Sequence, residues 1–141
     1  MKIGFGAAIV IGAAFLASCA TPAPKPAATT HVLFKTNWTA VKINGEDVPL
    51  NNTISLDFGD HRITGTGGCN RYFGAYDESE PALTISGLGA TKMACAGPIM
   101  AREQAYLSIL SAAARFAETD RGALEITARD GRAITLMPAG S

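Results

Sequence analysis

The chain has 141 residues, enough for one domain, and its 12 basic and 12 acidic side chains give a formal net charge of zero. Nucleic acid is not an expected partner, because phosphate neutralisation requires clustered cations and the sequence has no run of Lys or Arg. The two histidines, His31 and His61, are far apart in the sequence, whereas a zinc site needs three or four converging ligands. We therefore expect neither a metal nor another cofactor.

The N-terminus has the composition of an export signal. Lys2 precedes an apolar stretch from Ile3 to Leu16. Fourteen residues span only about 21 Å as a helix, which is too short for a bilayer core of roughly 30 Å. That length is typical of the apolar part of a secretory signal peptide. Residues 1–18 are therefore predicted to be a signal peptide.

The end of this segment, Leu16-Ala17-Ser18-Cys19, resembles the lipobox of bacterial lipoproteins. The resemblance implies cleavage before Cys19, a diacylglycerol on its sulfur, and acylation of the new N-terminus with a fatty acid such as palmitate. Two or three chains give stable membrane anchoring. Ala20, rather than the Asp that commonly retains lipoproteins in the inner membrane, favours the outer membrane, facing the periplasm. The alternative is an ordinary cleaved signal with an unmodified Cys19.

Residues 19–31 are rich in Pro, Ala and Thr and predict a flexible tether, and residues 32–138 are expected to form the folded domain. Apolar residues between Val32 and Ile43 indicate one or two strands that end at the turn Asn44-Gly45. Residues 54–58 alternate strictly between apolar and polar side chains, which predicts a half-buried strand. Shorter patterns predict further strands near residues 62–66, 72–76 and 83–85.

A single helix is predicted to begin at Gly97-Pro98, since proline is favoured at the first position of a helix. An apolar stripe at three- and four-residue spacing extends this predicted helix from Ile99 to about Ala117. Two alternating runs then flank Asp130-Gly131, a strong signal for a hairpin. Strands, one helix and a hairpin predict an α+β fold, a small curved antiparallel sheet or open β-barrel with one packed helix.

The cysteine count limits the possible disulfides. With Cys19 lipidated, only Cys69 and Cys95 remain, and exported chains meet an oxidising environment. A disulfide between them would contribute about 3–4 kcal/mol by the loop-entropy relation. Two free buried thiols and a thiol nucleophile are the alternatives, although no histidine lies near either cysteine in the sequence.

A glycine-rich run, Gly65-Thr66-Gly67-Gly68-Cys69-Asn70, precedes the strand expected near Tyr72. A phosphate-binding loop would require a following lysine and helix, and neither is present. We interpret the run as a tight bend or bulge, where glycine tolerates a positive φ. Asn70 is then expected to bond nearby backbone rather than a ligand.

The run Gly67-Gly68-Cys69-Asn70-Arg71-Tyr72, followed by Gly74-Ala75-Tyr76, resembles the signature of the META domain family, which includes HslJ-like lipoproteins. Thr91-Lys92-Met93-Ala94-Cys95 is similar to the second block of that family, Glu103 to the glutamate that follows it, and Trp38 to the tryptophan that opens the domain. The resemblance spans about Phe34 to Met137. It implies a small β-rich domain with one helix, exported or lipid-anchored and sometimes associated with heat shock and antibiotic tolerance. No enzymatic activity is established for the family as a class.

Together these features predict a non-enzymatic cell-envelope lipoprotein whose META-like domain is a binding or stress-response accessory module. An envelope protein, or an apolar ligand in the mouth of the curved sheet, is the expected partner. Trp38 and Phe73 are aromatic candidates for such a groove, with core packing as the alternative. The possible binding residues are Asn70, Arg71, Tyr72, Tyr76 and Lys92. Lys92 stands where the family commonly has Arg, which would weaken a bidentate contact to a carboxylate.

Two other functions stay open. One is a pilot or assembly factor for an outer-membrane complex. The other is an enzyme with an unrecognised site formed by Asn70, Arg71, Lys92 and Glu103, which would have to converge in an open cleft. The sequence lacks the Gly-x-Ser-x-Gly frame of serine hydrolases.

Overall fold

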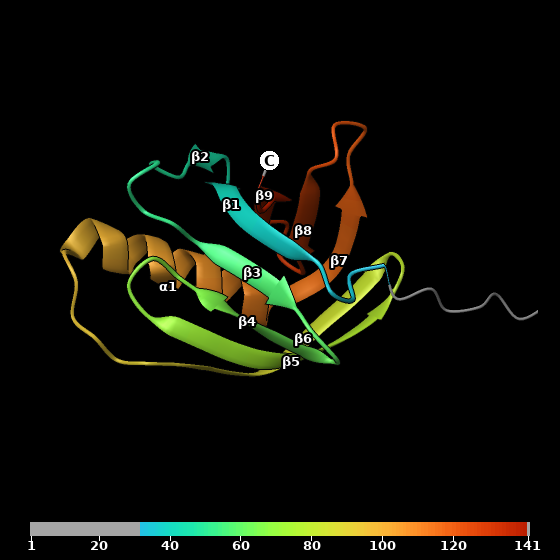
Figure 1. The fold of residues 1–141 in the computed structure, drawn as a ribbon, viewed down its shortest axis with the longest axis horizontal. Helices are drawn as coiled ribbons and strands as arrows, with labels where there is room; N and C mark the ends of the chain where they lie inside the picture. The colour runs from blue at the N-terminus through green and yellow to red at the C-terminus, as the bar shows by residue number, and fades with distance from the viewer. Residues whose placement is uncertain (1–31, 141) are drawn as a thin grey trace, which may run out of the picture.

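The computed structural model describes residues 32–140; the predicted signal peptide, Cys19 and the tether lie outside this range. Residues 32–140 form nine strands and one helix (Figure 1). Their bounds are β1 Asn37–Ile43, β2 Glu46–Asp47, β3 Ser55–Phe58, β4 Arg62–Thr66, β5 Arg71–Ser79, β6 Ala82–Ala90, α1 Gly97–Ser111, β7 Ala113–Glu118, β8 Leu124–Ala128 and β9 Ala133–Pro138.

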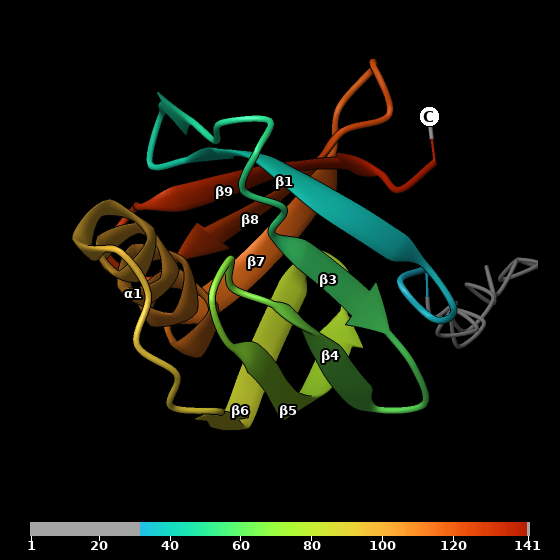
Figure 2. The same cartoon turned by 60° about the vertical axis from the view of Figure 1, so that its left-hand side comes forward.

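The strands close into an antiparallel barrel. From β3 to β9 each strand pairs with the next in the sequence, and β1 pairs with both β3 and β9, which completes the ring (Figure 2). The two-residue β2 pairs only with β1, as the second strand of a short hairpin. An α+β fold with a curved antiparallel sheet and one packed helix is confirmed. The open barrel is corrected to a closed one, because the β1–β9 pairing leaves no gap in the sheet.

Side-chain alternation fills the interior of the barrel. In β5, residues 72, 74, 76 and 78 are buried and their neighbours are exposed. Helix α1 packs against β6 and β8 and adds the fully buried Tyr106, Ile109 and Leu110 to the core. The helix therefore covers one end of the barrel, and its Tyr106 meets the side chains of β5.

The predicted helix is too long by about six residues. It ends at Ser111, and Ala113–Glu118 form β7 instead of its last turns. Phe116 faces the core, and β7 pairs along its length with β8. Alanine-rich segments have a high helix propensity, but the strand pairing satisfies the same backbone groups while burying Phe116.

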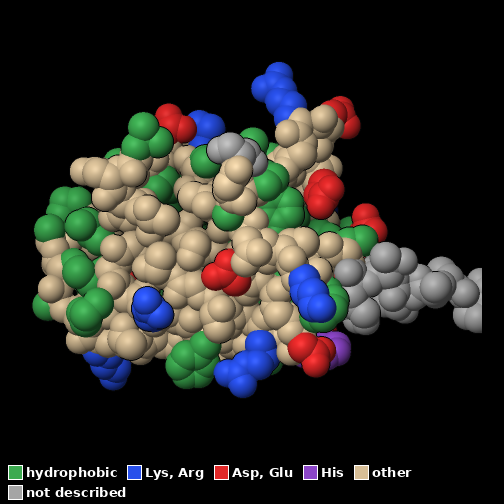
Figure 3. Space-filling view, in the orientation of Figure 1, with side chains coloured by type: hydrophobic (Ala, Val, Ile, Leu, Met, Phe, Trp, Pro, Cys, Tyr) green, Lys and Arg blue, Asp and Glu red, His purple; other side chains and the backbone are tan. Residues whose placement is uncertain are grey.

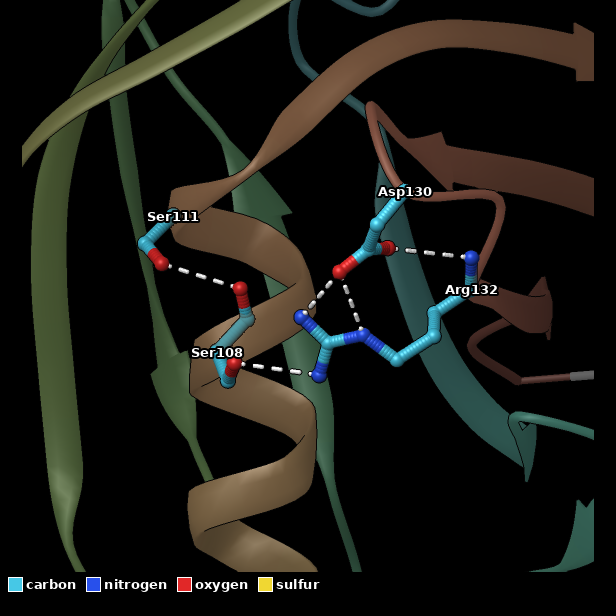
Figure 4. A network of polar contacts seen from close by, with 4 residues as sticks. All are labelled: Ser108, Ser111, Asp130 and Arg132. Carbon is cyan, nitrogen blue, oxygen red and sulfur yellow. Dashed lines mark hydrogen bonds and ion pairs between the residues drawn. The ribbon is translucent and has the colours of Figure 1, made fainter.

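The predicted hairpin at Asp130-Gly131 joins β8 to β9, and Gly131 has the positive φ that such a turn requires, at 88°. Arg132 donates to both the Asp130 carboxylate, at 2.8 Å, and Ser108 Oγ, at 3.0 Å (Figure 4). The hydrogen bonds that the side chain and the backbone amide of Arg132 donate to Asp130 hold the pKa of this carboxyl below its usual range. The turn is thereby attached to the last turns of α1.

Candidate functional site around the glycine-rich loop

The glycine-rich run forms the connection between β4 and β5, as a tight bend. Gly68 has φ +107°, and the Gly67 amide donates to the Asn70 carbonyl at 2.8 Å. Gly68 also donates to Thr66 Oγ1 at 3.2 Å. The prediction of a bend that needs a positive φ is confirmed at Gly68.

Gly65 and Gly67 are required for a different reason, because other atoms of the protein lie where their side chains would be. A Cβ at Gly67 would lie 2.6 Å from Cγ of Glu103, and a Cβ at Gly65 would lie 2.1 Å from the Ser55 carbonyl oxygen. Real Cβ atoms do not approach other atoms this closely. Gly67 therefore lets the loop close directly over the side chain of Glu103, and Gly65 lets the chain pass close to the backbone of Ser55.

Glu103 projects from α1 into this loop and is 3% exposed. Its Oε2 accepts hydrogen bonds from the amides of Cys69, at 3.0 Å, and Asn70, at 2.6 Å. Its Oε1 accepts from Asn70 Nδ2 at 2.6 Å. The carboxylate thus satisfies backbone donors of a loop that has no strand partner, and hydrogen bonds to a charged acceptor are stronger than neutral ones.

Asn70 joins the two sequence blocks of the signature. Its Oδ1 accepts from Thr91 Oγ1, at 2.9 Å, and from the Met93 amide, at 2.6 Å. Its Nδ2 lies 3.4 Å from the Met93 carbonyl in addition to its bond with Glu103. Asn70 bonds backbone, as expected, and the backbone that it reaches is that of Met93 in the second block.

A disulfide between Cys69 and Cys95 holds the same two segments together. Their Cα atoms are 6.0 Å apart, and the two cysteines have a sequence separation of 26. Both thiols are used in this bond, so neither free buried thiols nor a thiol nucleophile describes this structure. We call the group of Cys69, Asn70, Thr91, Cys95 and Glu103 the clasp.

Tyr72 lies beneath the clasp and faces the core. Its hydroxyl is 2.7 Å from the Ser55 carbonyl and 2.8 Å from the hydroxyl of Tyr106. Burial raises the pKa of both phenols well above the usual range. Tyr72 is thus a core residue with a satisfied hydroxyl, which corrects its prediction as a binding residue.

Tyr76 occupies the other end of β5 and is also buried. Its hydroxyl donates to the Gly59 carbonyl at 3.0 Å, and its ring meets Phe58 edge to face. Trp38 is buried too, and its Nε1 donates to Thr36 Oγ1 at 2.8 Å. Trp38, Tyr72 and Tyr76 thus direct their rings into the core, as the core-packing alternative expects, whereas Phe73 is exposed.

Of the four residues proposed for an enzymatic site, the structure brings two together. Asn70 and Glu103 are bonded to each other and to backbone inside the clasp, whereas the side chains of Arg71 and Lys92 are exposed. Arg71 alternates with Asn70 and Tyr72 along β5 and points away from the core. The four side chains do not converge in one open cleft.

Asn52 is a buried polar residue that the sequence analysis did not identify. It is 6% exposed, and neither atom of its amide has a hydrogen-bond partner among the described residues. Its Oδ1 faces Gly68, where a Cβ would come within 2.3 Å. No motif marks Asn52, because its position follows from a contact between two distant loops.

Within residues 32–140, no three His, Cys, Asp or Glu side chains are grouped as metal ligands would be. In the same part of the chain no helix has the length and apolar composition needed to cross a membrane.

Comparisons with known proteins give a family and related solved structures. The sequence profile of the META domain family matches residues 31–141. An NMR structure of a protein from Burkholderia xenovorans is 26% identical and superposes with a TM-score of 0.66, covering 93% of this chain and all of the other. A second NMR structure, also 26% identical, has a TM-score of 0.63 and covers 76% of this chain and 92% of its own. No curated protein matches the sequence.

Proposed function

This chain belongs to the META domain family, and from that premise we propose that it is a non-enzymatic, lipid-anchored module of the cell envelope that binds another envelope component. The observation that carries the proposal is that polar signature residues are hydrogen-bonded within the protein. Asn70 and Glu103, the two polar side chains of the signature that are buried together, bond each other and backbone. They stabilise the fold, which leaves the outer surface of the barrel for recognition.

The lipobox at Leu16-Ala17-Ser18-Cys19 supports the anchored state, and the disulfide agrees with an oxidising compartment. The predicted tether would separate the domain from the lipid surface, since a proline-rich segment extends by about 3 Å per residue. Ala20 after Cys19 supports an outer-membrane location facing the periplasm.

Mass spectrometry of the native protein under non-reducing conditions tests the anchored state. We expect loss of residues 1–18, an added lipid mass on Cys19, and a Cys69–Cys95 bond in the same molecule. A Cys19→Ser variant should lose the lipid mass and leave the detergent phase while keeping the disulfide. An unprocessed wild-type chain without lipid would contradict the proposal.

Crosslinking in intact cells tests how the module acts. A binding module should be recovered with its ligand in variable amounts, whereas a pilot or assembly factor for an outer-membrane complex should be recovered with one protein at a fixed stoichiometry. The Cys19→Ser variant is the matched control, since it keeps the folded domain and loses the predicted anchor. Equal recovery from both forms would show that anchoring is not needed for binding.

A further inference from the structure

The outer face of the sheet carries an aromatic side chain lying flat on the backbone. Phe73 pairs across the strands with Gly89, and a Cβ at Gly89 would lie 2.8 Å from Cζ of Phe73 and 3.2–3.3 Å from the adjacent ring atoms. The ring therefore covers Gly89 with one face, while the side chain stays 52% exposed. Only a glycine on β6 permits this arrangement, which leaves the other ring face open to solvent.

A β-bulge accompanies the flat ring. Between Phe73 and Ala75 on β5, the partner strand β6 contains an additional residue, and Gly87 in this bulge has φ +60°. Bulges redirect side chains and are frequent beside binding sites. Here the bulge lies directly next to the exposed aromatic ring.

Two hollows meet at Phe73, and each contains one arginine. The larger, of about 420 Å³, is lined on one side by Thr64, Thr66 and Arg71. The smaller, of about 250 Å³, includes Arg62 and Gly87. A ligand lying across the ring would therefore reach a guanidinium on each side and hydroxyl groups on one side.

The charge of this face is positive, although the whole chain is neutral. Arg71 and Thr91 exchange hydrogen bonds of 3.0 and 3.2 Å, and the exposed Lys92 follows Thr91 in the chain. The one carboxylate in the larger hollow, Asp57, accepts a hydrogen bond from Asn37 Nδ2 at 2.6 Å. Figure 3 shows basic side chains on both sides of a hydrophobic one over β4 and β5. We call Arg62, Arg71, Phe73 and Lys92 the basic platform.

We propose that the basic platform binds an acidic glycan. The apolar C–H face of a sugar ring stacks on an exposed aromatic ring, and Arg62 and Arg71 are placed to bind a carboxylate, phosphate or sulfate on either side of it. Thr64 and Thr66 offer hydroxyl groups for sugar hydroxyls. The choice of a glycan rests on the proposed function, because an envelope location presents the domain to polysaccharides. It also fits a platform with too few cations for the extended backbone of a nucleic acid.

Isothermal titration of the full-length chain in detergent, with hexasaccharides of galacturonic acid and of heparin, tests this inference. We expect at least one of them to bind and the neutral maltohexaose to bind at least tenfold more weakly. Binding should weaken with salt, since two arginines are involved. No binding by either acidic hexasaccharide, or equal binding of the neutral one, would overturn the inference.

Two variants test the role of the ring. Phe73→Ala should weaken binding by up to about tenfold, the upper end of what the loss of one aromatic contact produces. Gly89→Ala should weaken it similarly while retaining the ring and all charges, because its Cβ displaces the ring from the sheet. Phe34→Ala is the matched control, since Phe34 is also an exposed aromatic residue, at 42%, and lies outside the platform. Full affinity in both test variants would overturn the inference.

Charge is tested in the same way. Arg62→Ala and Arg71→Ala should each weaken binding about fivefold, as expected for loss of a charge-assisted hydrogen bond, and the exposed Arg121→Ala should not. Vesicles of phosphatidylglycerol provide a competitor. Binding to vesicles that depends on Phe73 and exceeds the glycan affinity would replace the glycan with an anionic lipid surface. A native protein that carries lipid on Cys19 but binds no glycan would contradict this inference alone and leave the proposed function intact.

Discussion

Strand β5 presents two faces with opposite uses, although their residues alternate along the same few positions. On the inner face, Asn70, just before the strand, and Tyr72 have their polar atoms bonded within the protein. On the outer face, Arg71 and Phe73 are exposed and border two hollows. A single signature run therefore contains residues that stabilise the fold and residues that are available to a partner. The residues of one motif can thus serve two different purposes.

The largest effect should come from removing the carboxylate of the clasp. Glu103→Ala leaves three buried donors of Cys69 and Asn70 without an acceptor, and we expect a loss of about 4 kcal/mol in the free energy of unfolding. Urea denaturation measures it. Gln104→Ala, one residue further along α1 and exposed, should change the free energy by no more than about 0.5 kcal/mol. A loss below about 1 kcal/mol for Glu103→Ala would show that the carboxylate does not stabilise the clasp as proposed.

The disulfide should rank next. Replacing both cysteines in Cys69→Ala/Cys95→Ala opens a loop with a sequence separation of 26 residues, which the entropy relation values at about 3.5 kcal/mol. Urea denaturation of the oxidised wild type and the double variant compares them, and reduced wild type is the control. Equal midpoints for all three would show that hydrogen bonds alone maintain the clasp.

Alkaline pH should destabilise the buried tyrosine pair. Folding raises the pKa of Tyr72 and Tyr106 above the value of about 10 in an unfolded chain, so the unfolded state releases protons first. The free energy of unfolding should be steady below about pH 9 and fall above about pH 10, by up to about 1.4 kcal/mol per pH unit for each tyrosine.

The control for this prediction is Tyr72→Phe/Tyr106→Phe, which should make the alkaline slope shallower because neither ring can then release a proton. Tyr76, whose pKa is also raised by burial, keeps its smaller contribution to the slope. The stability of the double variant near neutral pH need not equal that of the wild type, since the change in slope is the quantity compared. Identical slopes for the two proteins would indicate that the pair is accessible to solvent, contrary to the assignment of both rings to the core.

Asn52, in the loop before β3, extends the comparison because it is buried like the inner face of β5, but its side-chain amide has no partner among the described residues. Asn52→Leu should raise the free energy of unfolding by about 1 kcal/mol, since an unpaired buried amide costs that much or more. The exposed neighbour Asn51→Leu should have no comparable effect. Thermal denaturation would show the difference, and a lower melting temperature for Asn52→Leu would contradict it.

The smallest effects should come from the outer face. Arg71→Ala and Phe73→Ala should each change the free energy of unfolding by less than about 0.5 kcal/mol, because exposed side chains contribute little to stability. Tyr72→Ala, between them in the sequence, should cost about 4 kcal/mol, as expected when a buried aromatic ring is removed. Similar losses for all three variants would show that the two faces are not energetically distinct.

The sequence by itself predicted those features that depend on a few neighbouring residues. Alternation located β3, β8 and β9 but not β7, the Gly97-Pro98 pair located the start of the helix, and Asp130-Gly131 located the hairpin. The bend at Gly68 followed from the glycine-rich run, because glycine tolerates the positive φ that a tight bend needs. Each of these signals is local, because side-chain periodicity and turn chemistry act over two to four residues.

Other features were decided only by contacts between residues that lie far apart in the chain. The helix ends at Ser111 because β7 finds a strand partner, and the barrel closes because β1 meets β9. Glu103 lies 33 residues from Asn70, and the role of both side chains appears only when α1 crosses the end of the barrel. A buried polar group is stable only with a partner, and the sequence does not state which distant residue supplies it.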